Sequence, residues 1–188
     1  MEAFWVSITT VGVAEIGDRT QLLSLVLAAR YRRPWPIILG ILCATLANHG
    51  VAGFVGVWFG SLLKPRALEI VVGVSMIAMA LWTLKPDKLD QSAASAGAMG
   101  AFLATLTSFF VAEIGDKTQI ATLALAAAYP NLLAVVAGTT AGMLLANVPV
   151  VFMGKAFADR LPLKAIHYFA AALFVVLGIV FLLRALWK

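Results

Sequence analysis

Two identical six-residue segments, VAEIGD, place four carboxyl groups in a chain that is otherwise strongly apolar. They are Val13–Asp18 and Val111–Asp116, and each is followed by a basic residue, a threonine and a glutamine. Each segment carries a glutamate and an aspartate three positions apart, which would share one face of a continuous helix. Carboxylate oxygens suit hard divalent cations such as Ca²⁺, Mg²⁺ and Mn²⁺. The pattern therefore indicates a divalent-cation site.

The predicted site combines both segments and has a simple charge balance. The four acids carry −4 and the two neighbouring bases carry +2, so one divalent ion would neutralise the remaining −2. Two glycines between the acids permit a bend or free a backbone carbonyl. The predicted metal ligands are Glu15, Asp18, Glu113 and Asp116; the charge-balancing bases are Arg19 and Lys117; the candidate hinges are Gly17 and Gly115.

Neutral side chains near the acids are predicted to support the ion. For the two asparagines, a hydrogen bond between helices is as good an interpretation as a ligand. His49 adjoins one of them and is interpreted either as a proton relay or as a structural histidine. The supporting polar residues are Thr20, Gln21, Thr118, Gln119, Asn48 and Asn147.

A simpler interpretation of the charges is a pair of salt bridges within helices. Glu15 with Arg19, and Glu113 with Lys117, are spaced four residues apart in the favourable order. Such bridges would leave Asp18 without an explanation, and they would not explain the duplication.

The composition indicates an integral membrane protein. Hydrophobic residues make up 62% of the 188 residues and charged residues 12%, against about 25% charged in soluble domains. The net charge of +5 comes largely from loops between apolar stretches, so it does not predict a nucleic-acid partner. The single cysteine, Cys43, excludes an internal disulfide and a multi-thiolate metal site. No cleavable signal segment is evident, since acids interrupt the first apolar stretch.

Six apolar stretches are long enough to cross a bilayer, which takes about 20 residues. A linker at residues 85–98 separates a first repeat, 1–84, from a second repeat, 99–188. The predicted spans are Phe4–Ala29, Pro36–Gly60, Leu68–Leu84, Gly100–Ala128, Leu132–Phe157 and Ala165–Leu186.

The duplication predicts two repeats of opposite orientation. A shift of 98 positions (113 minus 15) aligns Ser7–Gln21 with Thr105–Gln119, and nine of the fifteen aligned residues are identical. Three spans per half make the second half enter the membrane from the other side. The predicted fold is an all-α integral membrane protein of six transmembrane helices in two inverted-topology three-helix repeats. Lys and Arg divide eight to four between the two faces, which predicts a cytoplasmic linker and external termini.

The motif E-x-G-D-[KR]-[TS], present twice in six spans, resembles the calcium:cation antiporter-2 family. Glu15–Thr20 and Glu113–Thr118 match it without departure. The family comprises manganese and calcium transporters of the Golgi, the chloroplast and the bacterial plasma membrane. The resemblance implies export of Mn²⁺, with or without Ca²⁺, across the inner (plasma) membrane in exchange for protons. It implies no prosthetic group, and the expected partners are the metal ion and the lipid bilayer.

Other functions remain open from the residues alone. A six-span exporter of amino acids or other small solutes could use Glu15 and Arg19 to hold a zwitterion. An intramembrane aspartyl protease would use one aspartate on each of two helices, although the motif has glutamate where those enzymes have a glycine. A passive channel could select cations with the same carboxylates. The spacing does not choose between Mn²⁺ and Ca²⁺, and the sequence indicates no oligomeric state.

Overall fold

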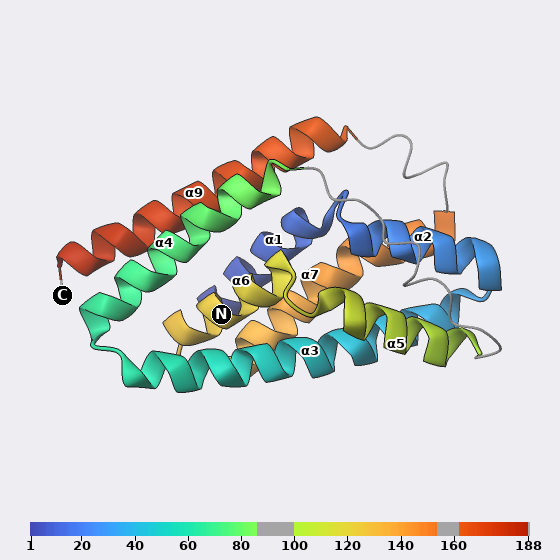
Figure 1. Cartoon of the computed structure of the whole chain (residues 1–188), viewed down its shortest axis with the longest axis horizontal. Coiled ribbons are helices and arrows are strands. Elements are labelled where there is room, and N and C mark those ends of the chain that lie inside the picture. Colours follow the sequence, from blue (N-terminus) through green and yellow to red (C-terminus); the bar gives the residue numbers. More distant parts are fainter. Residues whose placement is uncertain (86–99, 154–161, 188) are drawn as a thin grey trace.

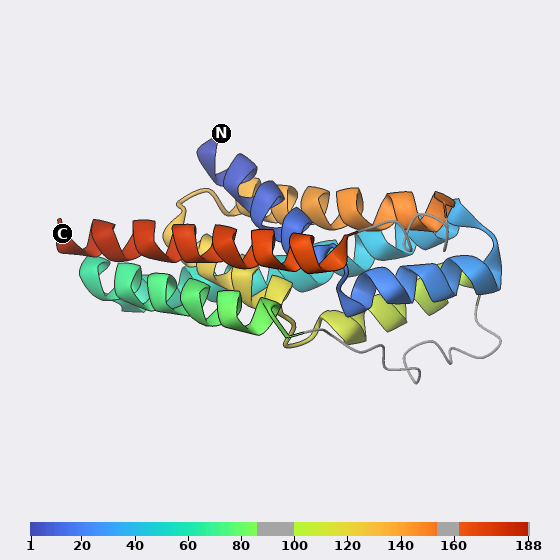
Figure 2. The same cartoon turned by 90° about the horizontal axis from the view of Figure 1, so that it is seen from above.

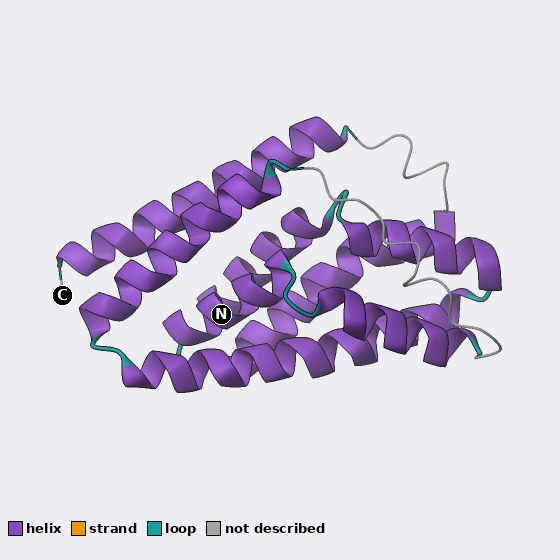
Figure 3. Ribbon diagram, in the orientation of Figure 1, coloured by secondary structure: helices purple, strands orange, loops and turns teal. Residues whose placement is uncertain are grey.

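A computed structural model describes residues 1–85, 100–153 and 162–187. The described residues form helices joined by short turns, which confirms the predicted all-α class (Figure 3). The described helices are α1 (Glu2–Glu15), α2 (Arg19–Tyr31), α3 (Pro34–Leu62), α4 (Pro65–Thr83), α5 (Ala101–Glu113), α6 (Lys117–Ala128), α7 (Leu132–Met153) and α9 (Leu163–Leu186).

Four of these helices, α3, α4, α7 and α9, are long and apolar enough to cross a membrane. They correspond to four of the six predicted spans. Proline stands in the first turn of α3 and α4, where its missing N–H would have no partner inside the helix. The predicted end of the fifth span at Phe157 lies outside the described residues, as does the linker from residue 86 to 98.

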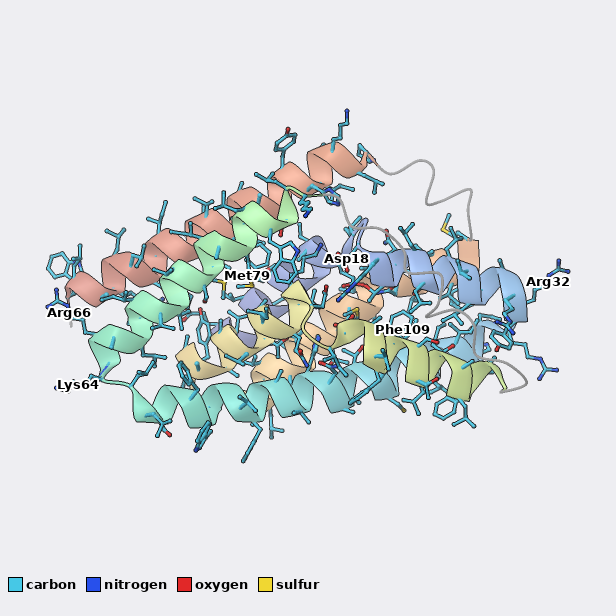
Figure 4. The ribbon with its side chains drawn as sticks, in the orientation of Figure 1. Asp18, Arg32, Lys64, Arg66, Met79 and Phe109 are labelled. Atoms are coloured by element: carbon cyan, nitrogen blue, oxygen red, sulfur yellow. The ribbon has the colours of Figure 1, made fainter. Side chains whose placement is uncertain are left out.

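The other two predicted spans are not continuous helices, so the acids of each motif do not share one helix face as a continuous helix would have them do. Phe4–Ala29 is divided into α1 and α2, and Gly100–Ala128 is divided into α5 and α6. Each break falls on the EIGD motif. Figure 1 shows α1 and α2 following one another towards the Arg32 end of the molecule, whereas α5 and α6 follow one another back from it. Figure 4 shows Asp18 between that end and the opposite end, where Lys64 and Arg66 lie.

Glycines bring the helices into close contact in a repeated pattern. A Cβ atom on Gly40 of α3 would lie 2.9 Å from the Phe102 carbonyl oxygen, and one on Gly138 of α7 would lie 2.5 Å from that of Phe4. Both the glycines and the phenylalanines are 98 positions apart. The contact of α3 with α5 therefore repeats in the contact of α7 with α1.

Helices α4 and α9 lie side by side along most of their length (Figures 1 and 2). Gly73 and Gly178 face each other, because a Cβ on either would lie 2.9 Å from the other's carbonyl oxygen. Small residues of this kind let helices pack closely in a membrane.

The distribution of polar groups is the reverse of that in a soluble domain. Large apolar side chains are exposed on the outer faces of the helices, including Phe54, Trp58, Val176 and Leu183. The motif acids and many hydroxyl side chains are buried inside. An apolar exterior around a polar interior suits a lipid environment.

Candidate functional site

The first motif forms a turn between α1 and α2. α1 ends at Glu15, Ile16 is extended, and Gly17 has a φ of +82°. Asp18 is the N-cap of α2. Glycine adopts a positive φ without the steric cost that a Cβ brings, so Gly17 allows the chain to leave one helix and enter the next within three residues.

The second motif forms the same turn between α5 and α6. α5 ends at Glu113, Gly115 has a φ of +73°, and Asp116 is the N-cap of α6. The backbone N–H of Thr118 donates to Asp116 Oδ2 at 3.4 Å. In both motifs the acids therefore lie on either side of a helix break rather than on one face of a continuous helix. Broken helices at membrane depth are tolerated where they line a polar interior.

The threonines hold both acids of their own motif. Thr118 Oγ1 lies 2.9 Å from Glu113 Oε2 and 3.1 Å from Asp116 Oδ2. Thr20 Oγ1 contacts Glu15 Oε1 in the same way and lies 3.4 Å from Asp18 Oδ2. Each hydroxyl thus lies within hydrogen-bond distance of both carboxyl groups of its motif and has one proton to share between them.

The glutamines secure the turns. Gln21 Oε1 accepts from Gly17 N at 2.8 Å, and Gln119 Oε1 accepts from Gly115 N at 2.7 Å. The Gln21 amide nitrogen also donates to the Ala146 carbonyl at 2.9 Å. These two predicted supporting residues therefore shape the backbone of the turns and tie them to neighbouring helices.

The basic residues join the two motifs. Arg19 Nη2 lies 2.9 Å from Asp116 Oδ1, and Lys117 Nζ pairs with Asp18 Oδ1. Each base thus bonds to the aspartate of the other motif, which differs from the interpretation as salt bridges within helices. A helix break between Glu15 and Arg19 removes the regular spacing on which such a bridge depends.

The two asparagines come from α7 and α3. Asn147 Nδ2 donates to Glu15 Oε1 at 3.0 Å, and its Oδ1 accepts from Ser24 at 2.6 Å. Asn48 Oδ1 accepts from Gln119 at 2.6 Å. Asn147 therefore contacts a motif acid directly, whereas Asn48 contacts the glutamine that holds the turn at Gly115.

Two histidines lie closer to the motifs than their sequence positions indicated. His49 Nε2 lies 3.6 Å from Glu113 Oε2. His167, near the start of α9, lies against the first turn, since a Cβ on Gly17 would be 2.9 Å from its Nε2. Extending the alignment of the repeats to residues 49 and 147 pairs His49 with Asn147 and could have identified the first of these contacts.

All four acids are buried, at 2% exposure or less. The aspartates are paired with the bases, whereas Glu15 Oε2 and Glu113 Oε1 have no hydrogen-bond partner among the described residues. Within those residues, no three His, Cys, Asp or Glu side chains are grouped closely enough to hold a metal ion. The arrangement brings the two motifs together around two carboxyl groups that have no lysine or arginine partner among the described residues. The side chains of the two motifs would have to move closer together to surround an ion.

Known proteins resemble the chain along its whole length. The family model described as divalent cation/proton antiporter GDT1 matches residues 3–91 and again residues 101–188. A Vibrio cholerae protein named "Putative manganese exporter" is 53% identical over 180 residues, which cover 95% of this chain and 90% of that protein. A GDT1-like protein of Synechocystis is 28% identical over 201 residues, which cover 96% of each chain. No solved structure matches the chain.

Proposed function

The chain belongs to the GDT1 family of divalent cation/proton antiporters, and on that premise we propose that it exports Mn²⁺, with or without Ca²⁺, from the cytoplasm in exchange for protons. The proposed site is built from the two EIGD motifs. The family consists of membrane transporters, which confirms the prediction that the chain is not an enzyme. Family membership also sets aside the protease and the exporter of amino acids.

The observation that carries the proposal is that the two glutamates are buried and, among the described residues, form no ion pair with a lysine or arginine. The aspartates are neutralised by Arg19 and Lys117, so the net −2 of the cluster rests on Glu15 and Glu113. Both are fully buried, and each has one oxygen without a hydrogen-bond partner among the described residues. Buried charges need a partner or a metal ion. One divalent ion between these carboxyl groups would supply it.

The six-span inverted repeat is the architecture that best accommodates these contacts. The family model matches two successive segments. The helix pairs α1–α2 and α5–α6 run in opposite directions (Figure 1). The contacts of the threonines and glutamines with their own motifs, and of the bases with the opposite motif, recur at an interval of 98 residues. These features support two repeats, residues 1–84 and 99–188, joined by the linker at 85–98.

Exchange requires a site that opens to one side at a time, and the two sides of the molecule differ. Towards the Leu62 end, α3 packs tightly on α6, because a Cβ on Gly56 would lie 2.3 Å from the Leu123 carbonyl oxygen. Towards the Arg32 end, a cavity of about 490 Å³ lies between α2 and α7, lined by Arg32, Arg33 and Phe152 among others. Rocking of one repeat against the other would exchange these arrangements, with Gly17 and Gly115 as bends beside the site.

Protons are the proposed counter-ions because of the same charge balance. Release of a divalent ion returns the buried cluster to −2, and two protons would restore neutrality. Metal and protons would therefore compete for the same oxygens, and metal binding would release protons. The distribution of Lys and Arg supports an orientation with the linker in the cytoplasm and both termini outside, in the inner (plasma) membrane.

Flux in proteoliposomes tests this function. Vesicles containing the full chain and a metal-sensitive dye are exposed to Mn²⁺, Ca²⁺ and Mg²⁺ in turn, with and without an imposed pH gradient. The expected result is Mn²⁺ movement against its own gradient when the pH gradient is imposed. Protons should acidify the compartment that the Mn²⁺ leaves. Mn²⁺ movement that only runs down its gradient would identify a channel, and no Mn²⁺ movement would reject the proposal.

Cysteine labelling tests the orientation. In a Cys43→Ser background, a membrane-impermeant thiol reagent added to intact cells should fail to label Ser92→Cys in the linker. Labelling from outside would overturn the proposed orientation, though not the inverted repeat.

A further inference from the structure

We propose, on the basis of the transport function above, that His49 is a ligand of the transported ion and makes the site prefer Mn²⁺ to Ca²⁺ and Mg²⁺. This imidazole comes from α3 and approaches Glu113, the glutamate of the second motif.

His49 is fully buried, and neither of its ring nitrogens has a hydrogen-bond partner among the described residues. A buried polar nitrogen without a partner destabilises the folded state. Its Nε2 lies 3.6 Å from Glu113 Oε2, which is too far for a hydrogen bond. Two atoms at that separation can both bind an ion that lies roughly 2.0–2.2 Å from each. The pair is therefore spaced as two ligands of one small ion.

The equivalent residue in the other repeat behaves differently. Asn147 stands 98 positions after His49 and faces Glu15 as His49 faces Glu113. Its Nδ2 donates to Glu15 Oε1 at 3.0 Å and its Oδ1 accepts from Ser24 at 2.6 Å. Both ends of the Asn147 amide are thus engaged in hydrogen bonds. We call each EIGD motif, with the side chains that contact it, a half-site. At the same place in the second half-site, the His49 imidazole has no hydrogen bond among the described residues and is left to bind an ion.

The chemistry of an imidazole nitrogen determines which ions it favours. Ca²⁺ and Mg²⁺ bind through oxygen ligands; Mn²⁺ also favours oxygen, but it is the one transition metal of the three and accepts an imidazole nitrogen more readily than they do. An otherwise oxygen-based site with one such nitrogen would retain divalent selectivity and gain a preference for Mn²⁺. The four motif acids alone do not distinguish these ions, so His49 would supply the discrimination.

Pulsed electron paramagnetic resonance of Mn²⁺ bound to the purified full-length chain tests the ligand directly. The expected result is a ¹⁴N hyperfine coupling that is replaced by a ¹⁵N coupling when the protein is labelled with ¹⁵N-histidine. Bound Mn²⁺ with no histidine coupling would overturn the role of His49 and leave the transport function standing. If Mn²⁺ does not bind at all, both proposals fail.

The variant His49→Asn makes the two half-sites alike and tests selectivity. Titration calorimetry should show Mn²⁺ affinity lower by at least about tenfold, with Ca²⁺ affinity changed by less than about twofold, and the histidine coupling should disappear. His167→Asn removes the other imidazole of the chain and is the matched control, with the coupling and the ratio of affinities retained. Equal losses for Mn²⁺ and Ca²⁺ in His49→Asn, or loss of the coupling only in His167→Asn, would overturn the inference.

Discussion

The two EIGD half-sites share a backbone and differ in their surroundings. Both contain a glycine with positive φ, a threonine on both acids and a glutamine on the turn. They differ in the base, since the Lys117 side chain is 2% exposed and that of Arg19 is 34% exposed. They differ also in the partner of the glutamate, an asparagine in the first half-site and a histidine in the second. The shared parts position the carboxyl groups, and the divergent parts set their charge environment.

Neutralising either glutamate should have the largest effect and should be equally severe in both half-sites. Glu15→Gln and Glu113→Gln keep the side-chain shape and remove one of the two negative charges that lack a basic partner. We expect Mn²⁺ flux in proteoliposomes to fall at least about a hundredfold in each, because a direct ligand matters more than the groups that orient it. Glu2→Gln, on an exposed acid, is the control and should retain flux. Near-normal flux in one of the two variants would place the site in a single motif.

Exchanging the bases should separate the half-sites. Lys117→Arg forces a larger, planar cation into a buried position beside Asp18, and lysine and arginine are not interchangeable at such sites. We expect its flux to fall about tenfold. Arg19→Lys is the matched variant and should lose less than about threefold, because a partly exposed ion pair contributes little. Equal losses in the two variants would show that the difference in burial has no consequence for transport.

The asparagines should show a smaller difference. Asn147→Ala removes a hydrogen bond to Glu15 itself, worth about 1 kcal/mol or roughly fivefold in Mn²⁺ affinity. Asn48→Ala removes a hydrogen bond to Gln119, which holds the turn at Gly115 and, among the described residues, forms no hydrogen bond with a motif acid. It should change the affinity less than about twofold. Titration calorimetry on the purified variants measures both. A larger loss in Asn48→Ala would mean that the turn at Gly115 controls the site more than the direct contact does.

The sequence predicts the helical fold well because lipid imposes a minimum span length. The four spans that form continuous helices were found from apolar length alone. At the motifs the sequence left two possibilities open, since Glu15 and Asp18 fit the spacing of a continuous helix and Gly17 permits a bend. Only the positive φ at Gly17 and Gly115 reveals the turn. Local pattern therefore identified the residues of the motif without identifying their conformation.

The candidate site was predictable in its members and less so in its pairings. The repeat identified the acids and the bases, and the two asparagines were found as neutral polar residues of the apolar spans. Arg19 pairs with Asp116 rather than with Glu15 because the two repeats meet at the motifs, and that contact spans a distance in sequence that local spacing cannot encode. The same holds for His49 and Glu113, which lie on different helices.

Substitutions of the two turn glycines test the difference between the half-sites through the thermal stability of the protein. Both Gly17 and Gly115 have positive φ, so an alanine at either costs about 1–2 kcal/mol in backbone strain. The space around them differs: a Cβ on Gly17 would lie 2.9 Å from His167 and from Leu163, whereas one on Gly115 would have no atom within 4 Å. We therefore expect Gly17→Ala to lower the unfolding temperature of the purified protein more than Gly115→Ala does.

Asparagine substitutions separate the effect of backbone strain from that of steric conflict, because asparagine tolerates a positive φ better than alanine does. Gly115→Asn should be more stable than Gly115→Ala, since strain is the whole cost at an open position. Gly17→Asn should gain little over Gly17→Ala, because the steric conflict with His167 and Leu163 remains. Thermal unfolding of the four variants in detergent measures the order. If both asparagine variants raised the unfolding temperature equally over their alanine counterparts, the packing of α9 on the first turn would not distinguish the half-sites. Their difference would then lie only in the charged and hydrogen-bonding partners of the glutamates.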